Sequence, residues 1–401
     1  MANVPKIRFP GFTEPWEQRK FDEAFIERRD KTEKENEDIL LSCAINGMFL
    51  NSELFGHFRG TTTIGYLRVK KNDLILSAQN LHLGNANVNL RFEHGIISPA
   101  YKVYDLNNCN PEFVQSWVKR DDTKKFFLAA TTEGASQCRK NIEWETLGKQ
   151  TILMPSLDEQ KRVGSFFGQL DHLITLHQRK VDDLKTMKKC LLQEMFPAEG
   201  SNVPKIRFPG FTDPWEQRKL SEMVGMTYGG GTPSTANDTF WYGDIPWIQS
   251  SNVVEDELFN VDIKKHISRD GLNHSAAQLV PENSVAVVTH VGVGKLVFMP
   301  YSYTTSQDFI SLGDMKCEPR FLCYALYKRL QEDLHIVQGS AIKGITKKDL
   351  MNKVISVPQI TEQTKIANTL QGLDHLITLH QSKLDDLKEL KKGLLQQMFV
   401  D

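Results

Sequence analysis

The 401-residue sequence lacks several features that mark common classes of protein. No apolar run approaches the roughly 20 residues that a membrane-spanning helix needs. The first ten residues lack the charged-then-apolar layout of a secretory signal peptide. The six cysteines include no C-x-x-C pair, which argues against a structural zinc site or a redox motif. We therefore expect free thiols and a cytoplasmic protein.

The sequence also lacks an excess of basic residues and the common catalytic motifs. The 49 basic residues face 50 acidic ones, so any contact with nucleic acid must come from a local arrangement of charge. No two prolines are adjacent, which excludes the Asn/Asp-Pro-Pro-aromatic segment of adenine methyltransferases. The run from Gly292 to Lys295 lacks the spacing of a phosphate-binding loop, and His172 and His177 lack that of a zinc-protease pair. We expect no catalytic residue, metal or cofactor on this chain.

What the sequence does contain is an internal repeat. Asn3–Lys20 and Asn202–Lys219 are identical at 17 of 18 positions, at an offset of 199. Asp171–Phe196 and Asp374–Phe399 are identical at 20 of 26 positions, at an offset of 203. Because such self-similarity decides the architecture, the chain is predicted to be a tandem of two equivalent halves.

Two long inserts between these near-copies barely resemble each other. They comprise residues 21–153 and 220–356. Each combines short β-type runs and turn residues with one later helix-like aromatic stretch, so each is predicted to be a mixed α/β domain. Repeated segments would present the same surface twice, whereas divergent inserts would face two different targets. The helix-like stretches are Pro111–Leu128 and Pro319–Leu334, and the clearest strand regions are Tyr66–Leu76 and Ser284–Met299.

After Pro155 and Pro358 the pattern becomes helical, with Asp158 and Thr361 as candidate N-caps. Apolar residues recur in steps of three and four, which is typical of a coiled-coil seam. Gly168 leaves open a later helix start. A helix of 39 residues would span about 58 Å, more than one turn of DNA. The predicted seam consists of Leu170, Ile174, His177, Val181, Leu184 and Leu191 in the first copy, and Leu373, Ile377, His380, Leu384, Leu387 and Leu394 in the second.

An antiparallel pairing of the two helices is expected, because a pseudo-two-fold axis would then relate the halves. His177 and His380 would approach each other near that axis as polar residues that set the register; a metal or pH role is the less favoured alternative. The fold class is thus mixed α+β, with two globular domains separated by a coiled coil. The expected segments are 1–156 and 201–358 for the domains, and 157–200 and 359–401 for the helices.

Candidate contacts with nucleic acid lie in polar loops, because Arg, Lys, Gln, Asn and Ser side chains can pair with base edges. For each, an ordinary loop is the competing interpretation. Trp241, Tyr242 and Trp247 are expected to pack in the core, and Lys119, Arg120, Lys124 and Lys125 to lie on a solvated helix face. The candidates are Asn46, Gln79, Asn80, Ser136, Gln137, Arg139 and Lys140 in the first half, and Gly230, Thr232, Ser234, Gln249, Asn252, Lys295, Gln307, Ser340 and Lys343 in the second.

This layout resembles the specificity subunits of type I restriction–modification enzymes over essentially the whole chain. The resemblance lies in the Arg-Phe-Pro-Gly-Phe openings at Arg8 and Arg207, and in the inserts ending near Pro155 and Pro358. Further matches are the Glu-Gln pairs that start the helices (Glu159–Gln160, Glu362–Gln363), the segments 230–233 and 245–248, and the segment 95–101.

The resemblance implies that each insert is a target recognition domain reading half of a bipartite DNA site. It also implies that the helices and constant blocks dock two methylation subunits, which carry S-adenosylmethionine and flip the target adenine. Restriction subunits with ATP and Mg²⁺ would complete the complex. Two other functions stay open at this point. One is a coiled-coil scaffold displaying two binding modules without DNA, and the other is an enzyme in its own right.

Overall fold

A computed structural model describes residues 3–56, 60, 62–136, 139–336 and 344–400. The chain forms two compact units: unit 1 consists of Met1–Arg179 and Gln381–Asp401, and unit 2 of Lys180–His380. Each unit contains one variable insert and part of each long helix. The segment boundaries expected near residues 156, 200 and 358 stay a prediction, since the units divide within the helices instead.

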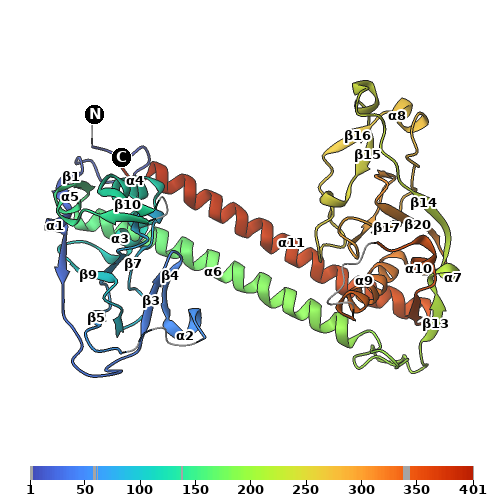
Figure 1. Ribbon diagram of the computed structural model, residues 1–401, viewed down its shortest axis with the longest axis horizontal. Helices are drawn as coiled ribbons and strands as arrows, with labels where there is room; N and C mark the ends of the chain where they lie inside the picture. Colours follow the sequence, from blue (N-terminus) through green and yellow to red (C-terminus); the bar gives the residue numbers. More distant parts are fainter. Residues whose placement is uncertain (1–2, 57–59, 61, 137–138, 337–343, 401) are drawn as a thin grey trace. The chain divides into compact units, whose positions relative to one another are not determined.

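A four-stranded antiparallel sheet forms the centre of unit 1 (Figure 1). Its strands lie in the order β2-β9-β6-β7, with Phe25 opposite Leu106 and Leu74 opposite Tyr104. All four residues of β6 are buried, as expected for a central strand packed on both faces. The strands are β2 (Phe25–Arg28), β9 (Tyr101–Leu106), β6 (Leu74–Ser77) and β7 (Ala86–Val88).

Four strand pairs and several short helices complete the described part of unit 1. The pair β1–β12 joins the constant block to the end of the insert, with Glu17 opposite Met154. The other elements are β1 (Glu17–Lys20), α1 (Phe21–Ala24), β3 (Leu41–Ala44), β4 (Gly47–Leu50), α2 (Asn51–Leu54), β5 (Leu67–Lys70), η1 (Leu81–Leu83), β8 (His94–Ile97), α3 (Pro111–Val118), α4 (Asp121–Ala129), β10 (Thr131–Ser136), β11 (Arg139–Ile142), α5 (Trp144–Lys149) and β12 (Thr151–Met154).

Unit 2 is built on a sheet of the same form (Figure 1). The order is β14-β20-β17-β18, again antiparallel, and all five residues of β17 (SVAVV) are buried. A three-stranded sheet, β16-β15-β19, packs beside it. The strands are β14 (Val224–Gly229), β20 (Phe309–Met315), β17 (Ser284–Val288), β18 (Leu296–Met299), β16 (Lys265–Ile267), β15 (Ile245–Ile248) and β19 (Thr304–Thr305).

The remaining elements of unit 2 include a strand pair that joins the constant block to the end of the insert, as in unit 1. In particular, β13 pairs with β21 as β1 does with β12, with Glu216 opposite Val357. The inserts therefore share a sheet topology although their sequences have diverged. The elements are β13 (Glu216–Lys219), α7 (Leu220–Met223), η2 (Asp238–Trp241), η3 (Ser250–Asn252), α8 (Arg269–Asn273), α9 (Pro319–Ile336), α10 (Lys347–Met351) and β21 (Val354–Val357).

The two repeated helical segments form helices of 38 residues each, α6 (Leu157–Glu194, green in Figure 1) and α11 (Ile360–Gln397, red). Both run unbroken through Gly168 and Gly372. The N-cap assignments were wrong, because each helix begins one residue before Asp158 or Thr361. At the start of α6 the Ser156 hydroxyl accepts the amide proton of Glu159, 3.4 Å away.

Within unit 1 the segments of α6 and α11 run antiparallel, as expected. Phe167 lies against Phe399 with ring centroids 6.0 Å apart, and Asp171 pairs with Lys391 at 2.5 Å, so residue numbers rise on one helix as they fall on the other. The mixed helix-and-sheet fold class is confirmed. The expected approach of His177 to His380 joins residues of different units and stays a prediction.

Many of the predicted seam positions are buried or half-buried. Leu170, Val181 and Leu184 are buried on α6, and Leu373, Leu384 and Leu387 on α11, while Ile174, His177, Ile377 and His380 are half-buried. Towards the end of each helix the buried position is Leu192 or Leu395, and the predicted Leu191 and Leu394 are only half-buried. The cause is the departure of the helix from strict heptad spacing, because 3.6 residues per turn drift against a seven-residue repeat.

Candidate nucleic-acid interface

An ion pair inside each unit fixes the constant block to the start of a long helix. The Arg8 guanidinium donates from Nε and Nη2 to the two carboxylate oxygens of Glu159, both at 2.7 Å. Arg207 and Glu362 repeat this bidentate pair at 2.8 and 2.9 Å. The glutamate side chains are only 1% exposed, and hydrogen bonding to Glu159 raises the pKa of Arg8. The pair locks the frame from which each insert projects.

The glutamine next to each buried glutamate joins the helix to the insert. The Gln160 side chain accepts from the backbone N–H of Asn110 at 2.8 Å and donates to the carbonyl of Pro155 at 2.9 Å. Gln363 does the same with Glu318 and Pro358, at 3.0 and 2.7 Å. Sequence reasoning noticed the Glu-Gln pairs but missed this role, for which their recurrence at offset 203 was the available signal.

An aromatic socket in each unit receives the end of a long helix. In unit 1, Phe399 stacks on Phe113 at 5.1 Å and meets Trp16 edge-on at 5.9 Å. In unit 2, Phe196 stacks on Phe321 at 5.4 Å and meets Trp215 at 5.8 Å. The socket of unit 1 thus closes around the end of α11, and that of unit 2 around the end of α6.

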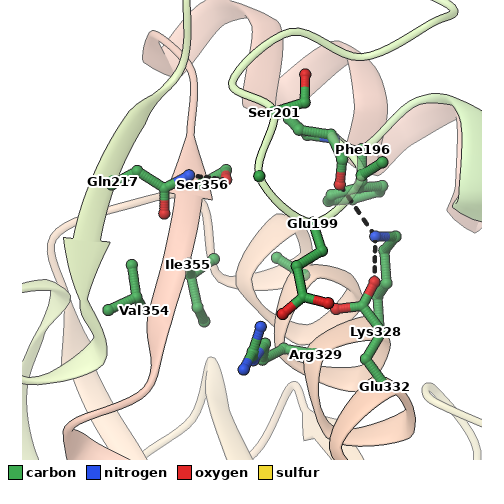
Figure 2. Close-up of a pocket in the computed structure, with 14 residues that line it drawn as sticks. Phe196, Glu199, Ser201, Gln217, Lys328, Arg329, Glu332, Val354, Ile355 and Ser356 are labelled. Carbon is green, nitrogen blue, oxygen red and sulfur yellow. Dashed lines mark hydrogen bonds and ion pairs between the residues drawn. The ribbon is translucent and has the colours of Figure 1, made fainter.

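The hollow of about 100 Å³ next to the unit 2 socket belongs to this joint (Figure 2). Lys328 donates to the carbonyl of Pro197 at 3.1 Å and pairs with Glu332 at 2.6 Å. Arg329 pairs with Asp333 at 3.0 Å. In unit 1, Arg120 donates to the carbonyl of Val400 in the corresponding place, at 3.3 Å. Because the cations of this hollow already bind carbonyl and carboxylate groups of the chain, we assign the hollow to the packing of the helix end against unit 2.

Polar loops of unit 2 meet at one end of the central sheet. The Thr232 hydroxyl donates to the side-chain oxygen of Gln307 at 2.8 Å, and both residues are exposed. Gln249 directly follows β15, and Gln307 lies shortly after β19. Because β15 and β19 are parallel neighbours, the two glutamines lie at the same end of the strands. The structure therefore brings these three predicted residues together. Gln278, which was not predicted, joins them by accepting from the backbone N–H of Gly229 at 2.9 Å.

Gly230 and Gly231 have a packing role. A Cβ on Gly230 would lie 1.8 Å from the carbonyl oxygen of Ser306, and one on Gly231 would lie 2.4 Å from the backbone of Ala276. The Gly231 N–H is already used by the carbonyl of Thr305, at 2.8 Å. Close backbone contact thus explains these glycines without a phosphate, and Ser234 remains an exposed residue at the edge of the loop.

Two predicted contacts of unit 2 are engaged internally. Asn252 is 5% exposed, and its amide accepts from Gln249 N–H at 2.9 Å and donates to the carbonyl of Asp262 at 2.8 Å. The Lys295 amine donates to the carbonyl of Val253 at 3.2 Å. Asn252 fits a turn-forming residue better than a base contact, because its hydrogen-bonding capacity is used within the fold.

In unit 1 the predicted residues lie in three separate loops. Asn46 is exposed in the β3–β4 turn, and Gln79 and Asn80 are exposed in the β6–β7 connection. That connection corresponds to the β17–β18 loop of unit 2, which contains Lys295. The backbone places Ser136, Arg139 and Lys140 in the β10–β11 hairpin. Gln137, Ser340 and Lys343 lie outside the described residues.

Two other expectations about side chains need correction. Lys119 and Arg120 do not lie on a solvated helix face. The Lys119 amine donates to the carbonyls of Ile45 and Ala86, and burial lowers its pKa to about 8, while Arg120 is 5% exposed. Tyr242 is not in the core but 80% exposed, whereas Trp247 is buried as expected.

The described ranges contain neither a metal-ion cluster nor a membrane-spanning helix. There, no three His, Cys, Asp or Glu side chains gather closely enough to hold a metal ion. In the same part of the chain, none of the helices has the length and apolar character needed to cross a bilayer.

Comparison with known proteins shows similarity to one family. Residues 212–389 match the family described as the type I restriction modification DNA specificity domain. The MjaIX specificity subunit of Methanocaldococcus jannaschii is 25% identical over 194 residues, which cover 47% of this chain and 44% of that protein. The putative MjaX specificity subunit of the same organism is 22% identical over 362 residues, covering 88% and 78%.

A solved structure supports the same assignment at the level of the fold. The crystal structure of the type I restriction–modification S subunit from M. genitalium aligns over 99% of both chains with a TM-score of 0.66 at 12% identity. Relatives that are named specificity subunits agree with the expectation of a non-catalytic subunit. The chain is therefore similar to type I restriction–modification specificity subunits, in sequence over residues 212–389 and in fold over nearly its whole length.

Proposed function

We propose that this chain reads a bipartite DNA site, one half-site per recognition unit, and docks two methylation subunits that modify adenine. The observation that carries the proposal is the repeated frame around unlike reading surfaces. The same ion pair, glutamine bridge and aromatic socket recur in both units, whereas the loops at the sheet ends differ. A frame that is repeated within the chain, with loops that differ between its two copies, suits two domains that read different DNA sequences.

Exposed apolar side chains on the long helices support the docking of partners. In unit 1, Leu173 and Leu176 of α6 and Leu390 of α11 are 46%, 45% and 52% exposed. Unit 2 has the same three positions, as Leu376, Leu379 and Met187, at 41%, 56% and 51%. Clusters of exposed apolar groups are typical of protein interfaces. One such cluster in each unit fits one methylation subunit per half.

The partner subunits would supply the cofactors. S-adenosylmethionine would bind the methylation subunits, and ATP with Mg²⁺ the restriction subunits of the complete complex. Because a base within a duplex cannot be methylated in place, the target adenine would be flipped out of the stack by the methylation subunit. The chain itself would contribute sequence recognition and positioning, in the cytoplasm, where the DNA is.

The proposal is tested by mapping methylated adenine genome-wide in cells that express methylation subunits with or without this chain. The expected result is one new bipartite motif that appears only when both are present. No motif, or a motif that persists without this chain, would contradict the proposal. A gel-shift assay with purified complex and duplex DNA separates it from a scaffold that does not bind DNA.

A further inference from the structure

A wide groove in unit 1 lies where the insert meets the long helices. It has a volume of about 810 Å³ and is bordered by the β3–β4 turn, by the end of α3 with the start of α4, and by α6 and α11. Asn46, one of the exposed residues proposed to contact DNA, lies on its rim. The groove is therefore continuous with the proposed reading surface of this unit.

The groove contains more positive than negative charge. Lys119, Arg120, Lys388, Lys391 and Lys392 line it, against Glu112, Asp121 and Asp171. Lys391 is held by Asp171 at 2.5 Å, and Lys119 by two backbone carbonyls.

Lys388 and Lys392 are the cations of the groove that the fold leaves available. Both are exposed, and among the described residues no carboxylate lies within ion-pair distance of either. Since they are four residues apart on α11, they project from the same helix face. Two neighbouring cations on one face form an anion-binding edge.

In unit 2 the surface equivalent to this groove is covered by side chains. The stacked Phe113–Phe399 and Phe321–Phe196 pairs align α3 with α9, so Tyr324 stands at the position of Ser116 and Tyr327 at that of Lys119. The Tyr324 hydroxyl donates to Asp374 at 2.5 Å, and Tyr327 hydrogen-bonds to Asp256.

Further side chains bridge the same place in unit 2. Gln371 replaces Gly168 and accepts from Arg320 at 2.6 Å. Lys188, the equivalent of Lys391, donates to the carbonyl of Asp256 at 3.3 Å as well as pairing with Asp374 at 2.5 Å. Large side chains and the loop at Asp256 thus cover the helix surface in unit 2. In unit 1 the same surface stays open because Ser116 and Gly168 are small.

We propose that the unit 1 groove binds the sugar–phosphate backbone of duplex DNA, with Lys388 and Lys392 each neutralising a phosphate. The inference rests on the proposed function. Contacts with phosphates fix the register of a protein on a duplex, and they lie beside the loops that read bases. Two exposed amines on a helix beside the proposed reading loop fit this arrangement. Because the equivalent surface of unit 2 is covered, the two halves of the chain hold DNA unequally.

The test is the salt dependence of DNA binding by the assembled complex of this chain with methylation subunits. Replacing Lys388 and Lys392 by Gln should reduce the slope of log K against log salt by about 0.9 per phosphate lost, hence by about 1.8. Binding should weaken equally for cognate and unrelated duplexes, and the methylated motif should not change. The matched control is Lys185→Gln with Lys189→Gln, the equivalent pair on α6 in unit 2, which should leave the slope unchanged.

A second variant, Ser116→Tyr, introduces the unit 2 side chain into the open groove and should also weaken binding. An unchanged slope, or an equal change in both lysine pairs, would overturn the groove assignment. Loss of assembly with methylation subunits in the Lys388/Lys392 variant would overturn it as well, since the groove would then serve a protein. If the unaltered complex fails to bind any duplex, it is the proposed function that fails.

Discussion

Arg8 holds Glu159 through two hydrogen bonds of 2.7 Å across 151 residues of sequence, and the carboxylate is almost inaccessible to water. The ion pair encloses the whole first insert between its partners. The constant frame can therefore close around inserts of different sequence, and Arg207 with Glu362 shows that it does so twice.

Removing the arginine from this pair should be costly. Arg8→Met leaves the Glu159 carboxylate buried without its partner, which should lower the free energy of unfolding by about 3–5 kcal/mol. Urea denaturation of the purified chain would measure the loss. The control is Arg29→Met, whose ion pair with Glu27 is exposed and should contribute less than about 1 kcal/mol. Equal losses in the two variants would argue against a structural role for the buried pair.

The exposed leucines of unit 1 should be needed for partner binding and not for folding. Leu173→Asp with Leu176→Asp places two carboxylates on the proposed docking face, so the Kd for the methylation subunit should rise at least tenfold, about 1.4 kcal/mol. Light scattering of mixed subunits would detect the lost complex. His172→Asp, at an exposed polar position one residue away, is the control and should still assemble. If the leucine variant assembles normally, these leucines do not form the docking surface.

Exchange of one insert should change one half-site only. When residues 21–153 are replaced by another recognition insert, methylation mapping should show a new first half-site and an unaltered second one. The frame residues Trp16, Glu159 and Phe399 stay in place, but the new insert must supply an aromatic residue at the position of Phe113 to fill the socket. A motif altered in both halves would contradict independent reading.

Thiol reactivity should separate one cysteine from four others. Cys190 is exposed, whereas Cys43, Cys109, Cys317 and Cys323 are buried. Burial raises the pKa of Cys43 to about 11, so at pH 8 only about one molecule in a thousand carries its reactive thiolate. In a Cys138→Ser background, a thiol reagent at pH 8 should label one cysteine quickly and the others only after unfolding. Rapid labelling of more than one in the folded chain would contradict the described burial.

The same burial predicts how stability depends on alkaline pH. The folded chain keeps the Cys43 thiol protonated up to a higher pH than the unfolded chain, whose thiols ionise near pH 9. The contribution is therefore complete below pH 9 and is lost as the pH rises toward 11. The free energy of unfolding of Cys43→Ala should fall less steeply between pH 8 and pH 10 than that of the unaltered chain. Parallel pH profiles would exclude this contribution.

The repeat made the architecture predictable, because identical segments at fixed offsets must fold alike. It identified α6 and α11 and their seam at Leu170, Val181, Leu373 and Leu384, all of which are buried. The loops were less predictable. Gly230 depends on the nearby carbonyl of Ser306, 76 residues away in the chain, and local sequence does not encode such a contact.

Polar and charged residues were the hardest to place from sequence. Lys119 reads as a surface residue, yet carbonyls from two other segments enclose its amine. Asn252 reads as a base-reading amide, yet it is buried and donates to the carbonyl of Asp262, ten residues away. In both cases the deciding partner comes from the fold, so residue type alone could not settle the role.

The sockets at Trp16 and Trp215 each take a phenylalanine, which meets the tryptophan edge-on and stacks on a second phenylalanine. Phe399 and Phe196 make the same aromatic contacts in the two sockets, so the connectivity of the chain helps to decide which helix end enters which socket. At high concentration during synthesis, the end of one molecule's helix can compete for the socket of another. Folding yield should therefore fall as protein concentration rises, because copies can exchange helix ends. This hazard comes directly from building one protein out of two equal frames.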